Sequence, residues 1–272
     1  MPGIHICEVT ESRKISDNTF TVTVNCGALA AEARAGQFVH IKCGEALILR
    51  RPVSICTARG EACTFVFEVK GQGTRWLSEV IPGQALDILG PLGNGYDIPE
   101  NGNILLVGGG IGVPPLLFAA ETASAARSKE RTGDHGETEA SNSRVIAMLG
   151  FRSKERVILQ EEFRGACDNV YPTTDDGSYG LHGTVDWPVE ELLNSGWSGE
   201  VLACGPRVML SAVARLCERY YVPCQVSLEE RMGCGVGACL VCACATVHYG
   251  AERMSRVCRD GPVFDSREVI WD

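Results

Sequence analysis

Four cysteines near the end of the chain have the types and spacing that bind an iron–sulfur cluster. They read C-x4-C-x2-C, followed after fifteen intervening residues by a fourth cysteine. This is the plant-type ligand spacing, in which four thiolates hold two irons bridged by two sulfides. The glycines at 233, 235 and 237 permit the tight backbone that wrapping a cluster requires. We therefore predict a [2Fe–2S] cluster bound by Cys234, Cys239, Cys242 and Cys258.

Zinc is the alternative metal for such a group. Structural zinc sites usually contain two C-x2-C pairs or a mixture of cysteine and histidine, and here only Cys239 and Cys242 form such a pair. Cys244 would point away from the ligand face if its segment is extended, so the predicted ligand set omits it.

The remaining cysteines do not suggest a disulfide framework. Such frameworks belong to short secreted chains, whereas this chain has 272 residues and no basic segment followed by an apolar run at residues 1–7. We expect reduced cysteines in a cytoplasmic protein. The scattered ones are interpreted as small buried hydrophobes: Cys7, Cys26, Cys43, Cys56, Cys63, Cys167 and Cys217.

Composition restricts the class of protein. The length accommodates two domains with a small appendix, and 45% hydrophobic with 22% charged residues is typical of a globular protein with a sizeable core. A net charge of −9 argues against an extended nucleic-acid surface, which needs a basic footprint. No apolar run approaches the length of a transmembrane helix. We expect neither nucleic acid nor membrane as a partner.

The elements that must position the cysteines begin with an antiparallel first half. Residues 19–24, 38–42 and 64–69 alternate between apolar and polar side chains, and residues 1–100 contain no convincing helical period. Several short strands at this spacing predict a small antiparallel barrel.

Two stretches of this half could bind an anion. In residues 49–55 an arginine, a stiffening proline and a serine can present a guanidinium and a hydroxyl to a pyrophosphate. The R-x-x-S pattern also recurs by chance, and Arg51 could be a solvated strand residue. Residues 70–74 form a glycine-rich turn before an expected helix start at 75–78, whose amides offer a second anion site. For any one of these glycines, taken alone, a simple turn is the commoner explanation.

The second half has the pattern of a nucleotide-binding domain. The buried strand 104–107 runs into a glycine-rich turn at 108–112 and a helical stretch at 116–126, the setting in which amides receive a dinucleotide's phosphates. Pro114 and Pro115 occupy the last positions of G-x-G-x-x-G, and prolines are tolerated in a first helical turn. We interpret this as a variant phosphate loop.

Further strands and helices alternate, which predicts a doubly wound parallel sheet. Expected strands are 145–151, 168–171 and 201–206, and expected helices are 154–163 and 207–220, with a polar surface loop at 124–144. Asp175 and Asp176 would follow the 168–171 strand and, if near the adenosine ribose, would repel the 2′-phosphate of NADP. Cys204 could face a nicotinamide ring or could simply be buried.

Together these segments resemble the ferredoxin reductase superfamily and, more closely, the electron-transfer subunits of class B dihydroorotate dehydrogenases. The resemblance spans essentially the whole chain. The most specific segment is SLEERMGCGVGAC at 227–239. The other segments that carry it are residues 49–55, 71–74, 89–95, 107–115, 203–206 and 257–264.

The resemblance implies an architecture of three parts. An antiparallel β-barrel FAD domain (1–100) is followed by an α/β doubly wound NAD domain (101–222) and a [2Fe–2S] subdomain (223–272). The implied FAD residues are Arg51, Pro52, Val53, Ser54, Val66, Phe67, Glu68, Gly73 and Thr74. The implied NAD residues are Gly108, Gly109, Gly110, Gly112, Cys204, Gly205 and Pro206. No side chain is assigned as an acid or base.

The resemblance also implies a partner and a reaction. A separate FMN-containing subunit would oxidise dihydroorotate to orotate in pyrimidine (UMP) synthesis, in a heterotetramer of two copies of each chain. Electrons would pass through the cluster and FAD to NAD+, because a flavin exchanges both single electrons and pairs. Two alternatives stay open: a reductase serving another acceptor such as ferredoxin or sulfur, and a zinc-stapled regulatory nucleotide-binding protein without redox activity.

Overall fold

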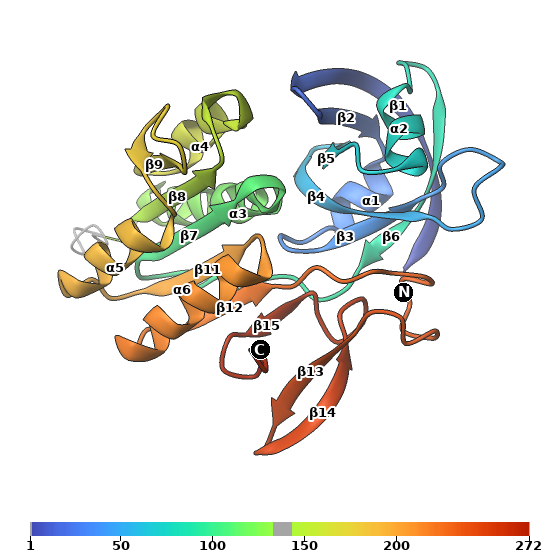
Figure 1. Ribbon diagram of the computed structural model, residues 1–272. Helices are drawn as coiled ribbons and strands as arrows, with labels where there is room; N and C mark the ends of the chain where they lie inside the picture. The colour runs from blue at the N-terminus through green and yellow to red at the C-terminus, as the bar shows by residue number, and fades with distance from the viewer. Residues whose placement is uncertain (1, 133–142, 272) are drawn as a thin grey trace.

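The computed structural model describes residues 2–132 and 143–271. It contains a barrel, an α/β layer structure and a C-terminal segment that lies against both (Figure 1). The expected fold class is confirmed. The domain boundaries after residues 100 and 222 remain predictions, and the seven-stranded sheet takes two of its strands from beyond residue 222.

The first half folds into a closed six-stranded antiparallel barrel in the order β1-β2-β5-β4-β3-β6. Alternating side chains fill its interior: Val39 and Ile41 of β3 and Phe65 of β5 are fully buried there. The strands are β1 (Gly3–Ser16), β2 (Thr19–Asn25), β3 (Phe38–Ile41), β4 (Arg51–Arg59), β5 (Ala62–Glu68) and β6 (Ala85–Leu92).

Two short helices accompany the barrel, α1 (Gly27–Glu32) and α2 (Gln72–Ser78), where the sequence showed no helical period. The helix expected at residues 75–78 is present, but it begins earlier, at Gln72, and ends at Ser78. The Thr74 hydroxyl accepts hydrogen bonds from the amides of Lys70 and Gly71, which fixes its first turn.

The second half is built on a seven-stranded sheet in the order β10-β9-β8-β7-β11-β12-β15. All neighbours are parallel except β15, which pairs antiparallel with β12. The strands are β7 (Ile104–Gly109), β8 (Val145–Phe151), β9 (Asn169–Thr174), β10 (Leu181–His182), β11 (Glu200–Cys204), β12 (Cys224–Ser227) and β15 (Val263–Asp265).

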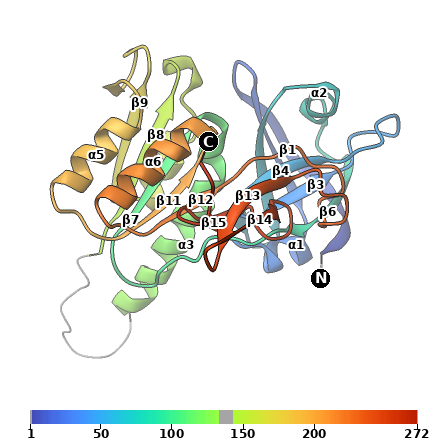
Figure 2. The ribbon, with the colours of Figure 1, turned by 60° about the horizontal axis from the view of Figure 1, so that its bottom comes forward.

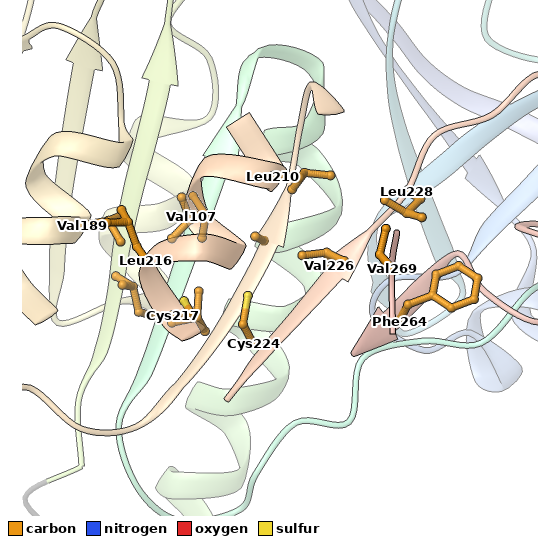
Figure 3. Packing of buried hydrophobic residues seen from close by; sticks show 14 of the residues in the cluster. Val107, Val189, Leu210, Leu216, Cys217, Cys224, Val226, Leu228, Phe264 and Val269 are labelled. Atoms are coloured by element: carbon orange, nitrogen blue, oxygen red, sulfur yellow. The ribbon is translucent and has the colours of Figure 1, made fainter. Parts of the chain in front are cut away.

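Helices cover both faces of this sheet, as Figures 1 and 2 show. On one face Val189 of α5 (Asp186–Asn194) and Leu210 and Leu216 of α6 (Arg207–Arg219) pack on strand residues such as Val107 and Val226 (Figure 3). Helices α3 (Val113–Thr132) and α4 (Gln160–Ala166) pack on the other. The doubly wound arrangement explains why the central strands are apolar throughout.

Two expected elements in this half differ from the structure. Residues 124–132, expected as loop, continue α3, because alanine, arginine, lysine and glutamate in this stretch have high helix propensity. Residues 133–142 lie outside the described residues. The expected helix 154–163 is broken into the 3-10 turn η2 (Lys154–Arg156) and α4, because Leu159 has a left-handed φ of 58°.

The C-terminal segment adds the hairpin β13 (Ala243–His248) and β14 (Ala251–Arg256). Cys242, Cys244 and Cys258 belong to the same hydrophobic cluster as α5 and α6, so this segment is continuous with the core of the α/β half. Among the described residues, no helix combines the length and apolar character that a membrane crossing requires.

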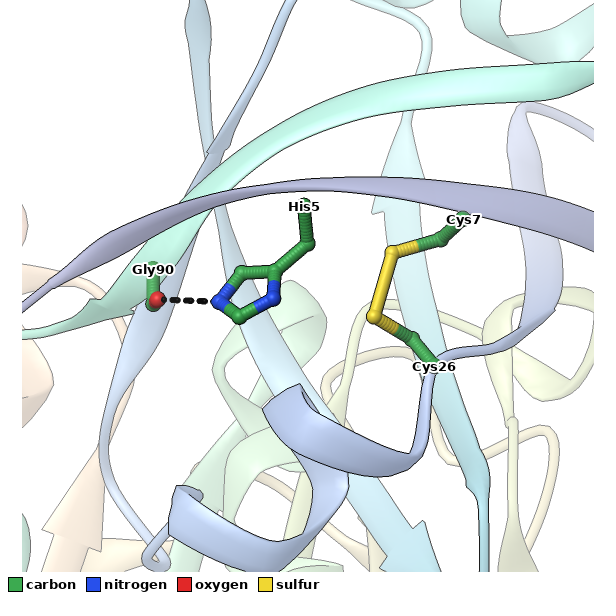
Figure 4. Close-up of a disulfide and its surroundings, with 4 residues drawn as sticks. All are labelled: His5, Cys7, Cys26 and Gly90. Atoms are coloured by element: carbon green, nitrogen blue, oxygen red, sulfur yellow. Dashed lines mark hydrogen bonds between the residues drawn. A yellow bond between two sulfur atoms is a disulfide. The ribbon is translucent and has the colours of Figure 1, made fainter.

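One expectation about the cysteines was wrong. Cys7 on β1 and Cys26 before α1 form a disulfide, with their Cα atoms 5.3 Å apart (Figure 4). The pair is separated by 19 residues, and the β1–β2 turn brings the two sulfurs together, a contact that spacing alone does not predict. The other cysteines interpreted as hydrophobes are free, and all of them except half-buried Cys167 are buried.

Candidate cofactor sites

A pocket lies between the barrel and the α/β half, at the place where the flavin was expected. Seven of the nine predicted FAD residues line it, from three separate segments of the barrel half. Its opposite wall contains Ile111 and Cys204 of the α/β half. Aromatic and aliphatic side chains with a few polar groups are the usual lining of a cofactor site. The seven residues are Pro52, Val53, Ser54, Val66, Phe67, Glu68 and Thr74.

Arg51 and Gly73 lie next to one another although neither lines this pocket. A Cβ at Gly73 would be 2.3 Å from Arg51 Nε, so only glycine lets the arginine side chain lie across the start of α2. The guanidinium donates to the carbonyls of Leu49 and Arg50, and no carboxylate in the described residues pairs with it. A guanidinium without a carboxylate partner fits the bidentate binding of a phosphate.

The predicted NAD turn lies at the carboxyl ends of two adjacent central strands. β7 and β11 run parallel with Gly108 opposite Cys204. A Cβ at Gly112 would lie 2.5 Å from both the carbonyl oxygen of Cys204 and the amide nitrogen of Gly205. The two sequence motifs therefore meet backbone to backbone, at the sheet edge where open α/β sheets bind ligands.

Gly109 and Gly205 are packed against one side chain, that of Met209 in the first turn of α6. Added Cβ atoms would lie 2.5 Å from Met209 Sδ and 2.7 Å from Met209 Cε, respectively. Pro206 is the residue before α6, and Gly110 has a φ of 53° with open space around it. Within this turn, Gly110 is therefore the position at which a dinucleotide could approach the backbone.

Cys204 lines the flavin pocket from the α/β side. It is 2% exposed, and burial, reinforced by the charge of Glu229, raises its pKa well above the ordinary thiol range. The thiol therefore stays protonated and neutral at physiological pH. This suits a packing surface for a ring, and its assignment to the nicotinamide remains a prediction.

The four predicted cluster ligands are brought together at the end of the chain. The amide of Cys234 donates to Cys239 Sγ over 3.4 Å, and the amide of Cys258 donates to Cys242 Sγ over 3.5 Å. The amide of Gly237 donates to Cys258 Sγ over 3.1 Å, which joins the first loop to the tail. Amide donors around thiolates are the environment that iron–sulfur clusters require.

The thiols of this site differ in their surroundings. Burial acts to raise the pKa of Cys234, but hydrogen bonds from the backbone of Val236, Cys239 and Ala238 outweigh it and lower the pKa to about 6. Burial raises the pKa of Cys258 to about 12, and hydrogen bonding with Cys242 adds to this. The lowered pKa favours the thiolate form of Cys234, which is the form that binds iron.

The four predicted cysteine ligands do not surround a single point. In the described ranges 2–132 and 143–271, no three His, Cys, Asp or Glu side chains converge as ligands of a single ion. A [2Fe–2S] cluster divides four thiolates between two irons, so its ligands need not converge on one point. Cys244 lies on β13, opposite Ser255 of β14, and its omission from the ligand set stays a prediction.

Sequence reasoning missed part of the flavin pocket. Phe38 and residues of the segment 227–232, just before the first cluster cysteine, also line it. The alternating pattern around Phe38 predicts a strand, but it does not indicate what the outer face of that strand contacts. Met232 is in this wall and Cys234 follows two residues later, so their Cα atoms are at most about 7 Å apart. The missed lining residues are Phe38, Lys70, Ile111, Ser227, Leu228, Glu229, Glu230, Met232 and Pro262.

The tail that carries Cys258 is fixed by contacts to the barrel half and to the cluster loop. The amide of Asn94 donates to the carbonyl of Gly261 over 2.7 Å, and its side-chain amide donates to the carbonyl of Asp260. Arg256 forms an ion pair with Asp260 and donates to the carbonyl of Gly237 over 3.2 Å. Cys258 is therefore held against the cluster loop from two directions.

Comparison with known proteins agrees with this geometry. The model of the iron–sulfur cluster binding domain of dihydroorotate dehydrogenase B matches residues 229–270. A dihydroorotate dehydrogenase B (NAD(+)) electron transfer subunit from Geobacillus thermodenitrificans is 41% identical over 99% of this chain and 100% of its own length. One from Streptococcus thermophilus is 39% identical over 96% of both.

The chain belongs to the dihydroorotate dehydrogenase B electron transfer subunit family. The family resemblance expected from the sequence is confirmed. Among solved structures, an NADH-dependent reduced ferredoxin-NADP oxidoreductase matches with a TM-score of 0.83 and 31% identity, over 100% of this chain and 92% of that one. The cytochrome b5 reductase domain of Ulva prolifera nitrate reductase (TM-score 0.61, 16% identity, 80% and 94% covered) shares the fold alone.

Proposed function

We propose that this electron transfer subunit takes electrons from a catalytic subunit that oxidises dihydroorotate to orotate and delivers them to NAD+, in pyrimidine (UMP) biosynthesis. Its redox groups are FAD, a [2Fe–2S] cluster and NAD. A flavin supplies the exchange between single electrons and the pair that a nicotinamide carries as hydride. The observation that carries the proposal is the wall shared by two sites: Met232 lines the flavin pocket and Cys234 begins the cluster loop.

The chain's residues hold and orient the three groups. In this proposal the flavin ring lies against Ser54 and the segment Val66 to Glu68. Its phosphates are bound by Arg51 and Thr74. The turn from Gly108 to Gly112 binds the phosphates of NAD. The nicotinamide lies against Cys204, Gly205 and Pro206. The four cysteines at 234, 239, 242 and 258 are the iron ligands.

The partner would dock over the cluster loop. Cys239 is exposed, and three apolar side chains beside it face solvent: Val236 (45% exposed), Leu240 (62%) and Val241 (56%). Exposed apolar side chains gathered on one loop are typical of an interaction site. We propose that the partner contains FMN, that two copies of each chain assemble, and that the complex is cytoplasmic.

Replacing one predicted iron ligand should abolish electron transfer from the partner while leaving FAD reduction by NADH intact. Cys239→Ala is expected to lose iron and sulfide and to lower dihydroorotate-dependent NAD+ reduction by the reconstituted complex more than about 100-fold, since even second-shell changes at metal sites cost 10–100-fold. Reduction of FAD by NADH should continue, because Cys239 lines neither the flavin pocket nor the NAD turn. Iron analysis, the visible spectrum of the anaerobic protein and stopped-flow flavin reduction measure these quantities.

The matched control is Cys167→Ala, which removes a half-buried free cysteine far from the cluster loop in the sequence. It should keep both activities. Undiminished transfer from the partner in Cys239→Ala would refute the proposal.

A second candidate is a reductase that serves ferredoxin or sulfur within a related complex. The 31% identical structure of an NADH-dependent reduced ferredoxin-NADP oxidoreductase favours it, because that protein has a similar fold over the whole chain. Co-purification from the source cell distinguishes the two: a dihydroorotate-oxidising partner supports the first candidate, and its absence with another redox partner bound supports the second. A colourless protein containing zinc would contradict both.

A further inference from the structure

A buried tyrosine, Tyr96, lies in the segment that connects the barrel to the α/β half, between β6 and β7. Its side chain is 8% exposed, and its hydroxyl donates a hydrogen bond to the carbonyl oxygen of Ala203 over 3.0 Å. A buried tyrosine hydroxyl usually finds such a partner. Tyr96 differs from an ordinary core tyrosine because its backbone is bonded to the barrel and its hydroxyl to the α/β half.

On the barrel side, Tyr96 rests on a segment that leads into the flavin pocket. The Tyr96 amide donates to the carbonyl of Ala35 over 2.8 Å. Gly36, with a left-handed φ of 89°, lies against the ring, because an added Cβ would be 2.8 Å from Tyr96 Cδ2. Phe38 follows two residues later and lines the flavin pocket. The ring of Tyr96 is therefore seated behind one wall of that pocket.

On the α/β side, the hydroxyl of Tyr96 is bonded to the end of β11, where the predicted flavin and NAD sites meet. Ala203 is followed directly by Cys204, which lines the flavin pocket. The Cys204 carbonyl and the Gly205 amide lie against Gly112 of the predicted NAD turn. The Ala203 carbonyl shares one planar peptide unit with the Cys204 amide, so a hydrogen bond to that carbonyl also restrains Cys204.

The surroundings of the hydroxyl keep it a hydrogen-bond donor. Burial holds the pKa of Tyr96 well above its ordinary value, the neighbouring Cys204 adds to this, and hydrogen bonding with Ser227 opposes it. The phenol is therefore protonated at physiological pH. Ser227 is the cross-strand partner of Cys204 on β12 and also lines the flavin pocket. Tyr96 thus lies behind the pocket wall that β11 and β12 form.

Other contacts hold the connecting segment against both halves. Gln37 Nε2 donates to the carbonyl of Gly93 over 2.8 Å on the barrel side. On the other side the Asp97 amide donates to Gln225 Oε1 over 2.9 Å, and Gln225 Nε2 donates to the Asp97 carbonyl over 2.6 Å. Tyr96 is therefore fixed between segments that are themselves anchored.

We propose that Tyr96 is a positioning residue for hydride transfer: seated on the barrel and bonded to Ala203, it sets the separation between a flavin in the pocket and a nicotinamide beside Cys204. The inference rests on the proposed function, because it needs both rings in these places. In that step a C–H bond of NADH breaks, and the hydrogen leaves with both bonding electrons to the oxidised flavin, which gives NAD+ and the reduced flavin anion. The rate depends on reacting atoms that lie roughly 3–3.5 Å apart.

Tyr96→Phe, in the full chain with its cofactors bound, keeps the ring and removes only the hydroxyl. We expect the rate of flavin reduction at saturating NADH to fall about tenfold, which is less than the roughly 100-fold cost of a 1 Å misplacement. The Kd for NADH and the FAD content should stay at their wild-type values, since the lost contact acts on the transition state. Stopped-flow spectroscopy measures the rate and the Kd, and NADH with deuterium at the transferred position shows that hydride transfer limits the rate.

Tyr171→Phe is the matched control, because it removes a hydroxyl from the α/β half at a position that is 41% exposed. It should keep the wild-type rate. A wild-type rate in FAD-loaded Tyr96→Phe, or a raised Kd at an unchanged rate, would overturn the inference and leave the proposed function intact. A wild-type chain whose flavin is not reduced by NADH would refute the proposed function, and with it the role of Tyr96.

A second pair of variants displaces the ring and keeps the hydroxyl, and it decides the question if Tyr96→Phe does not hold FAD. Gly36→Ala places a Cβ against Tyr96, whereas Gly60→Ala has a left-handed φ of 59° with nothing within 4 Å of the new Cβ. Both therefore carry backbone strain, and only the first moves Tyr96. We expect Gly36→Ala alone to slow flavin reduction at an unchanged Kd for NADH. Equal rates in the two variants would contradict the positioning role.

Discussion

At the scale of single residues, close approach of backbones explains why particular positions are glycine. Gly112 lies against the Cys204–Gly205 peptide, and Gly235 lies against the His40 ring with a left-handed φ. In both cases a side chain would separate segments distant in sequence. The sequence pattern marks these glycines as turn residues, but their contacts show that they join two cofactor motifs.

Gly112→Ala should therefore weaken NADH binding. The added Cβ would lie 2.5 Å from backbone atoms that cannot rotate away, and overpacking of this kind costs about 1–3 kcal/mol. We expect the Kd for NADH, measured from the concentration dependence of flavin reduction, to rise about tenfold while the flavin content is kept. Gly165→Ala in α4 is the control, because nothing lies within 4 Å of the new Cβ. Equal Kd values for the two variants would contradict this account of the NAD turn.

At the scale of elements, strand ends and strand faces position the chemistry. The outer face of β3 contributes Phe38 to the flavin pocket and His40 to the cluster loop, while its inner face fills the barrel. β9 ends beside Asp175 and Asp176, on the same edge of the sheet as the NAD turn. Both aspartates are exposed, and the Asp176 carboxylate accepts hydrogen bonds from the amide and hydroxyl of Ser178.

Asp175 is the more available of the two to repel a 2′-phosphate. We expect Asp175→Asn to raise the ratio of NADPH to NADH turnover about fivefold, since two like charges roughly 4 Å apart in water repel by about 1 kcal/mol. The measurement is kcat/KM for flavin reduction by each nucleotide, with Asp17→Asn in the β1–β2 turn as a charge-matched control. A ratio unchanged from the wild type would show that the carboxylate of Asp175 does not face the adenosine ribose.

At the scale of the whole molecule, the C-terminal segment joins the other two parts. It supplies two strands of the large sheet, one wall of the flavin pocket and the four predicted iron ligands, of which Cys239 is exposed. This places the cluster loop between the flavin pocket and solvent. The loop is therefore suited to receive electrons from a partner.

Leu240→Glu should weaken docking of that partner. A charge placed in an apolar contact must be desolvated, and we expect the Kd of the complex to rise at least roughly tenfold, or about 1.4 kcal/mol. Ile81→Glu is the control, because Ile81 is similarly exposed (65%) but lies outside the cluster loop. Calorimetry measures both, with iron content to verify that the loop is intact. Equal affinities in the two variants would place the docking surface elsewhere.

The sequence by itself determined the features that lie within short stretches. Cluster ligand spacing, strand alternation around Val39 and the glycine turn after β7 are local, because they reflect one loop, one strand or one strand–helix junction. Tertiary structure alone decided the contacts between stretches: Gly112 against Gly205, His40 against Gly235, Cys7 bonded to Cys26, and Met232 in the flavin wall. Such contacts depend on how barrel, sheet and tail pack together, and packing between distant segments produces no periodic pattern in the chain.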